Sequence, residues 1–143
     1  MIQKYVSKIS GPLLDRIDIH INVQSVKYKE LSSNVQGEPS VNIRQRVVKA
    51  REIQLKRFTG KKNMYCNAHM QSKDIREFCK IDSASEELMK MAITKLGLSA
   101  RAYDRILKVS RTIADLTGEE NISSAHISEA IQYRSLDRTM WLG

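Results

Sequence analysis

The sequence predicts a mainly α-helical protein, a helical bundle that follows one short β-strand near the N-terminus. From residue 41 onward, apolar residues recur at intervals of three and four, and serine or glycine stands where such helices should begin or end. Within residues 17–26, apolar and polar side chains alternate from Ile17 to Gln24, which predicts a half-exposed or edge strand. One strand cannot form a sheet, so we expect residues 1–40 either to be flexible or to pair with another copy.

Five helices are predicted, over residues 41–58, 72–79, 83–96, 100–116 and about 124–134. The expected N-caps are Ser40, Ser72, Ser83, Ser99 and either Ser123 or Ser124. The expected stops are Gly60, Gly97 and Gly118. In the first helix we expect an apolar stripe of Ile43, Val47, Ala50 and Gln54, with Val48, Leu55 and Phe58 beside it. In the fourth helix the stripe is Tyr103, Ile106, Leu107, Ser110, Ile113 and Ala114.

Composition narrows the class of protein. The formal net charge of +8 and the isoelectric point near 9.6 favour an anionic partner, such as nucleic acid or nucleotide. No run of about 18 apolar residues is present, so no membrane partner is expected. The first residues lack the apolar core of a signal peptide, and we expect a cytoplasmic location.

The cysteines do not predict a metal site. Cys66 and Cys79 form no CxxC pair, and in a cytosolic chain both are expected as free thiols. Cys66 and His69 lie close in sequence, but a closed zinc site needs four ligands and the remaining candidates are scattered. We therefore expect no metal bound by this chain.

Basic residues gather along the first long helix and just after it. They are Arg46, Lys49, Lys56, Arg57, Lys61 and Lys62. Such a face can contact nucleic-acid phosphates without sequence preference. The same pattern also describes an ordinary solvated helix face, and no aromatic residues are interleaved to stack on bases.

The sequence contains no recognisable catalytic motif. The sequence contains neither a GxxxxGK[ST] phosphate loop nor a GxGxxG turn, so we do not expect this chain alone to be an enzyme. Arg101 directly follows the Ser99 cap, where free backbone N–H groups and a guanidinium together can bind phosphate. On the residues alone, Arg101 is equally a solvated surface arginine. The simplest interpretation of Arg16 is an ion pair with Asp15 or Asp18.

Several segments resemble one family over nearly the whole chain. They are residues 8–20 (KISGPLLDRIDIH), 43–47 with Ala50 and Arg51, Asn67 and Ala68, 98–101 (LSAR), 105–116 (RILKVSRTIADL), and His126, Ile127, Ala130 and 133–138 (YRSLDR). These segments are similar to the end of the AAA+ core and the C-terminal lid domain of magnesium-chelatase-like ATPases of the ComM/YifB group. The resemblance implies an AAA+ lid fold, with residues 1–26 as the end of the core, 27–40 as a linker and 41–143 as the lid.

The resemblance also implies roles for three arginines. Arg16 matches the arginine finger, which acts on the nucleotide of the neighbouring subunit. Arg101 matches the second sensor, which contacts the γ-phosphate, and Arg105 is a secondary nucleotide-binding candidate one turn later. ATP and Mg²⁺ are implied for a longer parent protein, but not as tightly bound ligands of this chain. Its implied partners are its own AAA+ core and neighbouring subunits of a hexameric ring.

The implied function is that of a lid that senses ATP and couples its hydrolysis to motion, in a protein that acts on DNA during transformation. Two alternatives stay open. One is a helical module that binds DNA non-specifically through its basic residues. The other is the ATPase subunit of a metal chelatase, which would require a porphyrin-related activity.

Overall fold

The computed structural model describes residues 13, 16–21, 23–26 and 37–134. Within these residues the protein is mainly helical, which confirms the predicted class. The elements are α4 (Ser40–Arg57), the 3-10 helix η1 (Asn67–His69), α5 (Ser72–Phe78), α6 (Ser83–Leu96), α7 (Ala100–Thr117) and α8 (Ser124–Gln132). Each helix in this part of the chain is too short or too polar to cross a lipid bilayer.

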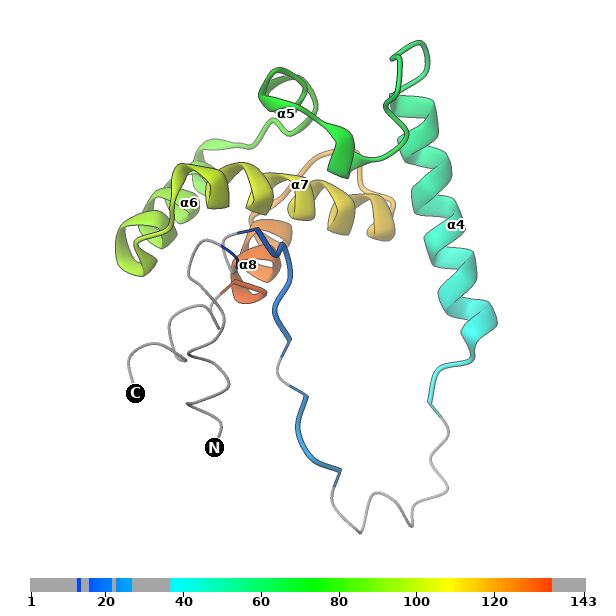
Figure 1. Ribbon diagram of the computed structural model, residues 1–143, viewed down its shortest axis with the longest axis horizontal. Helices are drawn as coiled ribbons and strands as arrows, with labels where there is room; N and C mark the ends of the chain where they lie inside the picture. The colour runs from blue at the N-terminus through cyan, green and yellow to red at the C-terminus, as the bar shows by residue number, and fades with distance from the viewer. Residues whose placement is uncertain (1–12, 14–15, 22, 27–36, 135–143) are drawn as a thin grey trace.

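Helix α7 lies at the centre of the fold. It packs against α4, α5, α8 and η1, and α8 packs in turn against α6 (Figure 1). Its inward stripe follows the predicted spacing: Ile106, Leu107, Ser110, Ile113 and Ala114 are all buried. Opposite this stripe, Ile127 of α8 is fully buried and Met89 of α6 is 1% exposed. Removal of this apolar surface from water is the main force that holds the helices together.

Both ends of α7 are formed as the sequence predicts. The Ser99 hydroxyl accepts a hydrogen bond from the backbone N–H of Ala102 at 3.2 Å and so caps the first turn. Gly118 ends the helix with a φ of +77°, a left-handed conformation that suits glycine. Gly97 ends α6 in the same way, with a φ of +54°.

Ser123 precedes α8 as its N-cap, one of the two predicted residues, whereas the predicted caps of α4, α5 and α6 are wrong by one residue. Pro39 precedes α4, and Ser40 is already helical. At α6 the side chain of Asp82, not Ser83, accepts the N–H of Ser85 at 2.8 Å. A carboxylate is both a strong acceptor and favourable at the positive end of the helix dipole, so it takes the position from the neighbouring serine. At α5, Gln71 is the cap instead of Ser72.

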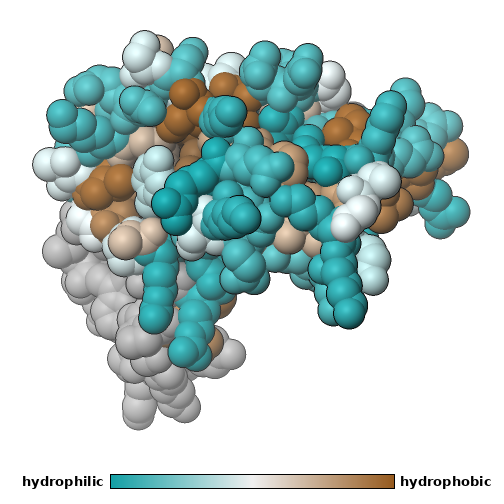
Figure 2. Space-filling model, turned by 90° about the horizontal axis from the view of Figure 1, so that it is seen from above, coloured by the Kyte–Doolittle hydropathy of each residue, from teal (hydrophilic) through white to brown (hydrophobic). Residues whose placement is uncertain are grey.

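The predicted apolar stripe of α4 is only half buried. Ala50, Gln54 and the adjoining Phe58 lie in the interior, whereas Ile43, Val47, Val48 and Leu55 are exposed by 43–50%. For Ile43, Val47 and Val48 the reason is geometric: α4 packs on α7 with its C-terminal half, and its N-terminal half extends beyond the other helices (Figure 1). Seen from above, hydrophobic atoms appear in several separate patches of a mostly hydrophilic surface, some of them on the α4 side (Figure 2).

The predicted strand over residues 17–26 does not form within the described part of this stretch, residues 17–21 and 23–26. A strand is defined by hydrogen bonds to a second strand, and none of the described segments supplies one. The segment instead leaves the helices as irregular chain (Figure 1). The expectation for residues 1–40 falls in large part on residues 1–12, 14–15, 22 and 27–36, which lie outside the described residues.

Candidate functional site

Arg101 lies in the first turn of α7, two residues after the Ser99 cap. Its side chain is exposed, while the next residue, Ala102, is fully buried and fixes this face of the turn against the core. Free backbone N–H groups at a helix start carry a partial positive charge, and an exposed guanidinium adds a full one. The first turn of α7 therefore presents a site that can receive an anion.

Arg16 lies in a tight turn, in which its backbone N–H donates to the carbonyl of Leu13 at 3.0 Å. Its side chain is exposed, so the guanidinium is available to a group outside this chain. Asp18, one of its two predicted ion-pair partners, pairs instead with Arg105. The other predicted partner, Asp15, lies outside the described residues.

Arg105 connects these two regions. It is one helical turn after Arg101 on α7, and its Nη1 donates to the carbonyl oxygen of Arg16 at 2.8 Å and to the carboxylate of Asp18. The structure thus brings Arg105, the secondary nucleotide-binding candidate, into contact with the backbone of the predicted finger turn. Its side chain remains 29% exposed.

The six basic residues expected on one DNA-facing surface do not share one environment. Arg46 pairs with Glu38, and Lys61 bonds to Asp74 at 3.2 Å and to Glu77 at 3.0 Å. Arg57 turns inward, where only 14% of its side chain is exposed. The remaining three, Lys49, Lys56 and Lys62, are exposed. An anion approaching this surface would therefore meet three lysines first.

Arg57 enters a buried network centred on Asp115, whose side chain is fully buried. Its guanidinium grips the carboxylate at two points, with N–O distances of 2.5 and 2.8 Å. Arg111, one turn before Asp115 on α7, donates to the same carboxylate at 3.1 Å. Asn67 of η1 donates its amide to the carboxylate at 2.8 Å and accepts from Arg57 at 2.9 Å. The network ties α4, η1 and α7 together.

Backbone carbonyl groups compensate for the excess positive charge of the two guanidiniums in this network. Two guanidiniums face one carboxylate, and the excess positive charge meets the carbonyls of Glu120 and Glu119, each 2.7 Å from a terminal nitrogen of Arg111. Burial lowers the pKa of Arg111, and the neighbouring Asp115 charge opposes that effect. Sequence reasoning missed this role for Arg57. The Arg111–Asp115 spacing of four residues on one helix was the available signal.

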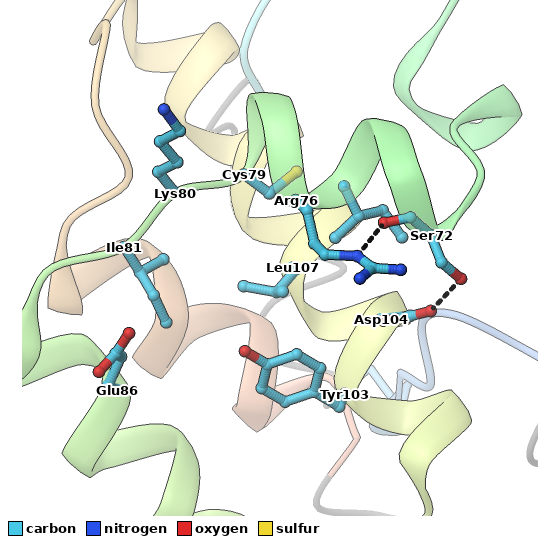
Figure 3. Close-up of a pocket in the computed structure, with 10 residues that line it drawn as sticks. Ser72, Arg76, Cys79, Lys80, Ile81, Glu86, Tyr103, Asp104 and Leu107 are labelled. Atoms are coloured by element: carbon cyan, nitrogen blue, oxygen red, sulfur yellow. Dashed lines mark hydrogen bonds between the residues drawn. The ribbon is translucent and has the colours of Figure 1, made fainter.

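A pocket of about 650 Å³ opens between α5, α7 and the start of α6 (Figure 3). The residues that line it include the apolar Leu107 and Ile81 together with charged groups of both signs. The Ser72 hydroxyl donates to Asp104 at 3.3 Å, and Arg76 donates from its Nε to the Ser72 carbonyl. These bonds hold several of the polar rim groups in place (Figure 3).

Cys79 also lines this pocket and is 4% exposed. Burial raises the pKa of its thiol to about 12, so the sulfur is protonated at neutral pH and behaves as a small apolar group. Cys66 is the second free thiol and is partly exposed. Across the described residues, no three His, Cys, Asp or Glu side chains come together as a set of metal ligands.

Comparison with known proteins adds evidence of ancestry. Residues 37–134 match the family described as magnesium chelatase, subunit ChlI C-terminal, and residues 1–31 match magnesium chelatase, subunit ChlI. Competence protein ComM of Haemophilus influenzae is 45% identical over 140 residues, which are 97% of this chain and 26% of that protein. The uncharacterized protein YifB of Escherichia coli is 40% identical over 138 residues, 96% of this chain and 26% of that protein.

The chain thus spans about a quarter of the length of these relatives. The family match covers the whole helical region from just before α4 to the end of α8. The predicted resemblance to the ComM/YifB group is therefore confirmed, and the chain belongs to the magnesium chelatase ChlI family, whose C-terminal part it contains.

Proposed function

We propose that this chain is the lid of a magnesium-chelatase-related AAA+ ATPase, and that Arg101 senses the γ-phosphate of ATP bound by the same subunit. The observation that carries the proposal is the first turn of α7, which combines a serine cap, helix-start N–H groups and an exposed arginine. Mg²⁺ and the phosphate-binding loop would come from the remainder of a longer parent protein.

Arg16 is proposed to act on the nucleotide of the neighbouring subunit in a hexameric ring. Its exposed guanidinium and its fixed backbone turn support this role, because a finger must reach outward from a rigid base. Arg105 is a secondary candidate for the nucleotide of its own subunit. In this proposal the lid moves when ATP is hydrolysed, and the ring uses that motion on DNA in the cytoplasm.

The test is the ATPase rate of the full-length parent, with and without DNA, for the wild type and for Arg101→Ala and Arg16→Ala. Lys90→Ala is the control, because Lys90 is an exposed cation on a different helix, α6. We expect both arginine variants to lose about 10³-fold or more of the stimulated rate while ATP binding largely survives. Unchanged rates in both variants would mean that both are surface arginines.

Mixed rings test which site each arginine serves. Subunits carrying Arg16→Ala keep their own Arg101, and subunits carrying Arg101→Ala keep the finger for a neighbour. In a 1:1 mixture about a quarter of the interfaces regain both arginines, so activity should reappear although each variant alone is inactive. If Arg16 acted within its own subunit, the mixture would regain no activity beyond the sum of its parts.

A second candidate function is direct DNA binding by the helical region, favoured by the exposed lysines Lys49, Lys56 and Lys62. The test is a DNA mobility shift of this chain at several salt concentrations, with the triple Lys→Ala variant. Binding through these lysines should weaken steeply as salt rises, with a slope that falls by about 0.9 per lysine removed. No shift at low salt would leave the sensor role as the function of this region.

A further inference from the structure

We propose that Arg105 is a positioning residue that fastens the turn carrying Arg16 to the helix carrying Arg101. The inference rests on the proposed function for its consequence, but the fastening itself is a property of this chain. It assigns to Arg105 a role in the neighbour's active site through Arg16, in place of direct contact with nucleotide in its own subunit.

The contacts converge on the backbone of residues 16–20. Arg105 donates to the Arg16 carbonyl at 2.8 Å and pairs with the Asp18 carboxylate. Arg134, just past α8 and 1% exposed, donates to the carbonyl of Ile17 at 2.7 Å. The backbone N–H of His20 donates to the carbonyl of Tyr133 at 2.9 Å. Four groups of this segment, on residues 16, 17, 18 and 20, are therefore tied to α7 or to the residues that follow α8.

Arginine suits this task for a chemical reason. Its planar guanidinium presents several N–H groups in a fixed fork, so one side chain can hold a carbonyl and a carboxylate together. A lysine at position 105 could pair with Asp18 but would hold the Arg16 carbonyl less firmly. The contact grips the backbone of Arg16, while the Arg16 side chain stays exposed and free to point outward.

Arg105 lies on the same helix as Arg101, so its contact with the Arg16 turn links the two arginines proposed to act on nucleotide. Arg101 and Arg105 are four residues apart, one turn of one helix, which is a rise of about 6 Å. A shift of this turn when Arg101 meets a γ-phosphate would carry the Arg16 turn with it. Occupancy of one nucleotide site would thereby set the position of the finger in the next site around the ring.

The fastening is tested first in this chain by hydrogen exchange of the His20 amide, compared with amides of α7. We expect Arg105→Ala and Asp18→Asn each to speed His20 exchange by about 10-fold or more, with Arg105→Lys in between. Lys90→Ala should change nothing, and α7 amides should stay protected in every variant. Unchanged His20 exchange in both Arg105→Ala and Asp18→Asn would overturn the proposal, whatever the ATPase results.

Mixed rings of the parent then separate positioning from direct nucleotide contact. If Arg105 acts through Arg16, both Arg105→Ala and Asp18→Asn subunits should regain activity when mixed with Arg101→Ala subunits, and neither should do so with Arg16→Ala subunits. If Arg105 instead contacts the nucleotide of its own subunit, Arg105→Ala subunits should regain activity with Arg16→Ala subunits and not with Arg101→Ala subunits. Asp18→Asn subunits should then be active without any partner variant. Wild-type activity of Arg16→Ala and Arg101→Ala would refute the proposed function while leaving the exchange result to decide the fastening.

Discussion

Arg57 and Asp115 are 58 positions apart in the chain, yet the guanidinium of one grips the carboxylate of the other at 2.5 and 2.8 Å. The pair joins the last turn of α4 to the last turns of α7. Because the Asp115 side chain is fully buried and only 14% of the Arg57 side chain is exposed, most of the Arg57 side chain is withdrawn from solvent by the fold. We therefore expect this pair to affect the stability of the fold more than the binding of a ligand.

Asp115→Asn should strongly destabilise the chain, because the substitution preserves shape but removes the charge that faces Arg57 and Arg111. Loss of one partner of a buried ion pair typically costs about 3–5 kcal/mol. Urea denaturation followed by circular dichroism would measure the change. Glu87→Gln, at an exposed position on α6, is the control and should unfold like the wild type. A loss below about 1 kcal/mol in Asp115→Asn would contradict the central role of this carboxylate.

Gly118→Ala should destabilise the C-terminal end of α7. A Cβ at this position would meet no atom within 4 Å, so the cost arises from the left-handed backbone alone, with a φ of +77°. That cost is about 1 kcal/mol. Gly37→Ala is a matched control, since a Cβ there also meets open space and the backbone is not left-handed. Equal stability of the two variants in urea denaturation would show that α7 can end in another conformation.

The two halves of α4 should differ in hydrogen exchange. No residue of α4 before Ala50 is buried, whereas Ala50 and Gln54 in its C-terminal half are buried. Amides of residues 44–49 should therefore exchange about 100-fold faster than amides of residues 106–114. Nuclear magnetic resonance of the chain at low concentration would measure both groups. Equally slow exchange would mean that another molecule covers the exposed stripe containing Val47 and Val48.

Cys79 should be nearly unreactive in the folded chain. With a pKa of about 12, its thiolate fraction at pH 8 is about 10⁻⁴, and burial blocks reagents as well. Alkylation of a Cys66→Ser variant, in which Cys79 is the remaining thiol, should be slow in buffer and fast in urea. Rapid labelling in buffer would show that the α5 region opens readily.

The same shift has a consequence for pH. Folding holds the Cys79 thiol neutral, so its contribution to stability is complete below the ordinary pKa of 9.0. Between that value and about 12 the unfolded state ionises while the folded state does not, and stability falls as pH rises. A Cys79→Ala variant should show a weaker loss of stability over this range, measured by denaturation at several pH values.

Local chemistry allowed the C-terminal end of α6 and both ends of α7 to be predicted, because Gly97, Ser99 and Gly118 act on their own backbone. The α4 stripe was predicted less well, because its burial depends on where α7 crosses it. Arg57 shows the same limit for the candidate site. Its neighbours in sequence are basic and suggest a DNA-facing surface. Its partner Asp115, however, lies on another helix, and no sequence pattern around Arg57 predicts that contact.

Helix α7 has 18 residues and is therefore about 27 Å long, with Arg101 in its first turn and Asp115 in its last. It is uninterrupted between its serine cap and Gly118, so it can act as a stiff lever. A tilt applied at the arginine end would be delivered at the far end to α4, through the clamp of Arg57 on Asp115. The N-terminal half of α4, which projects beyond the other helices, would then move with that clamp, so the two ends of the fold are mechanically linked through one helix (Figure 1).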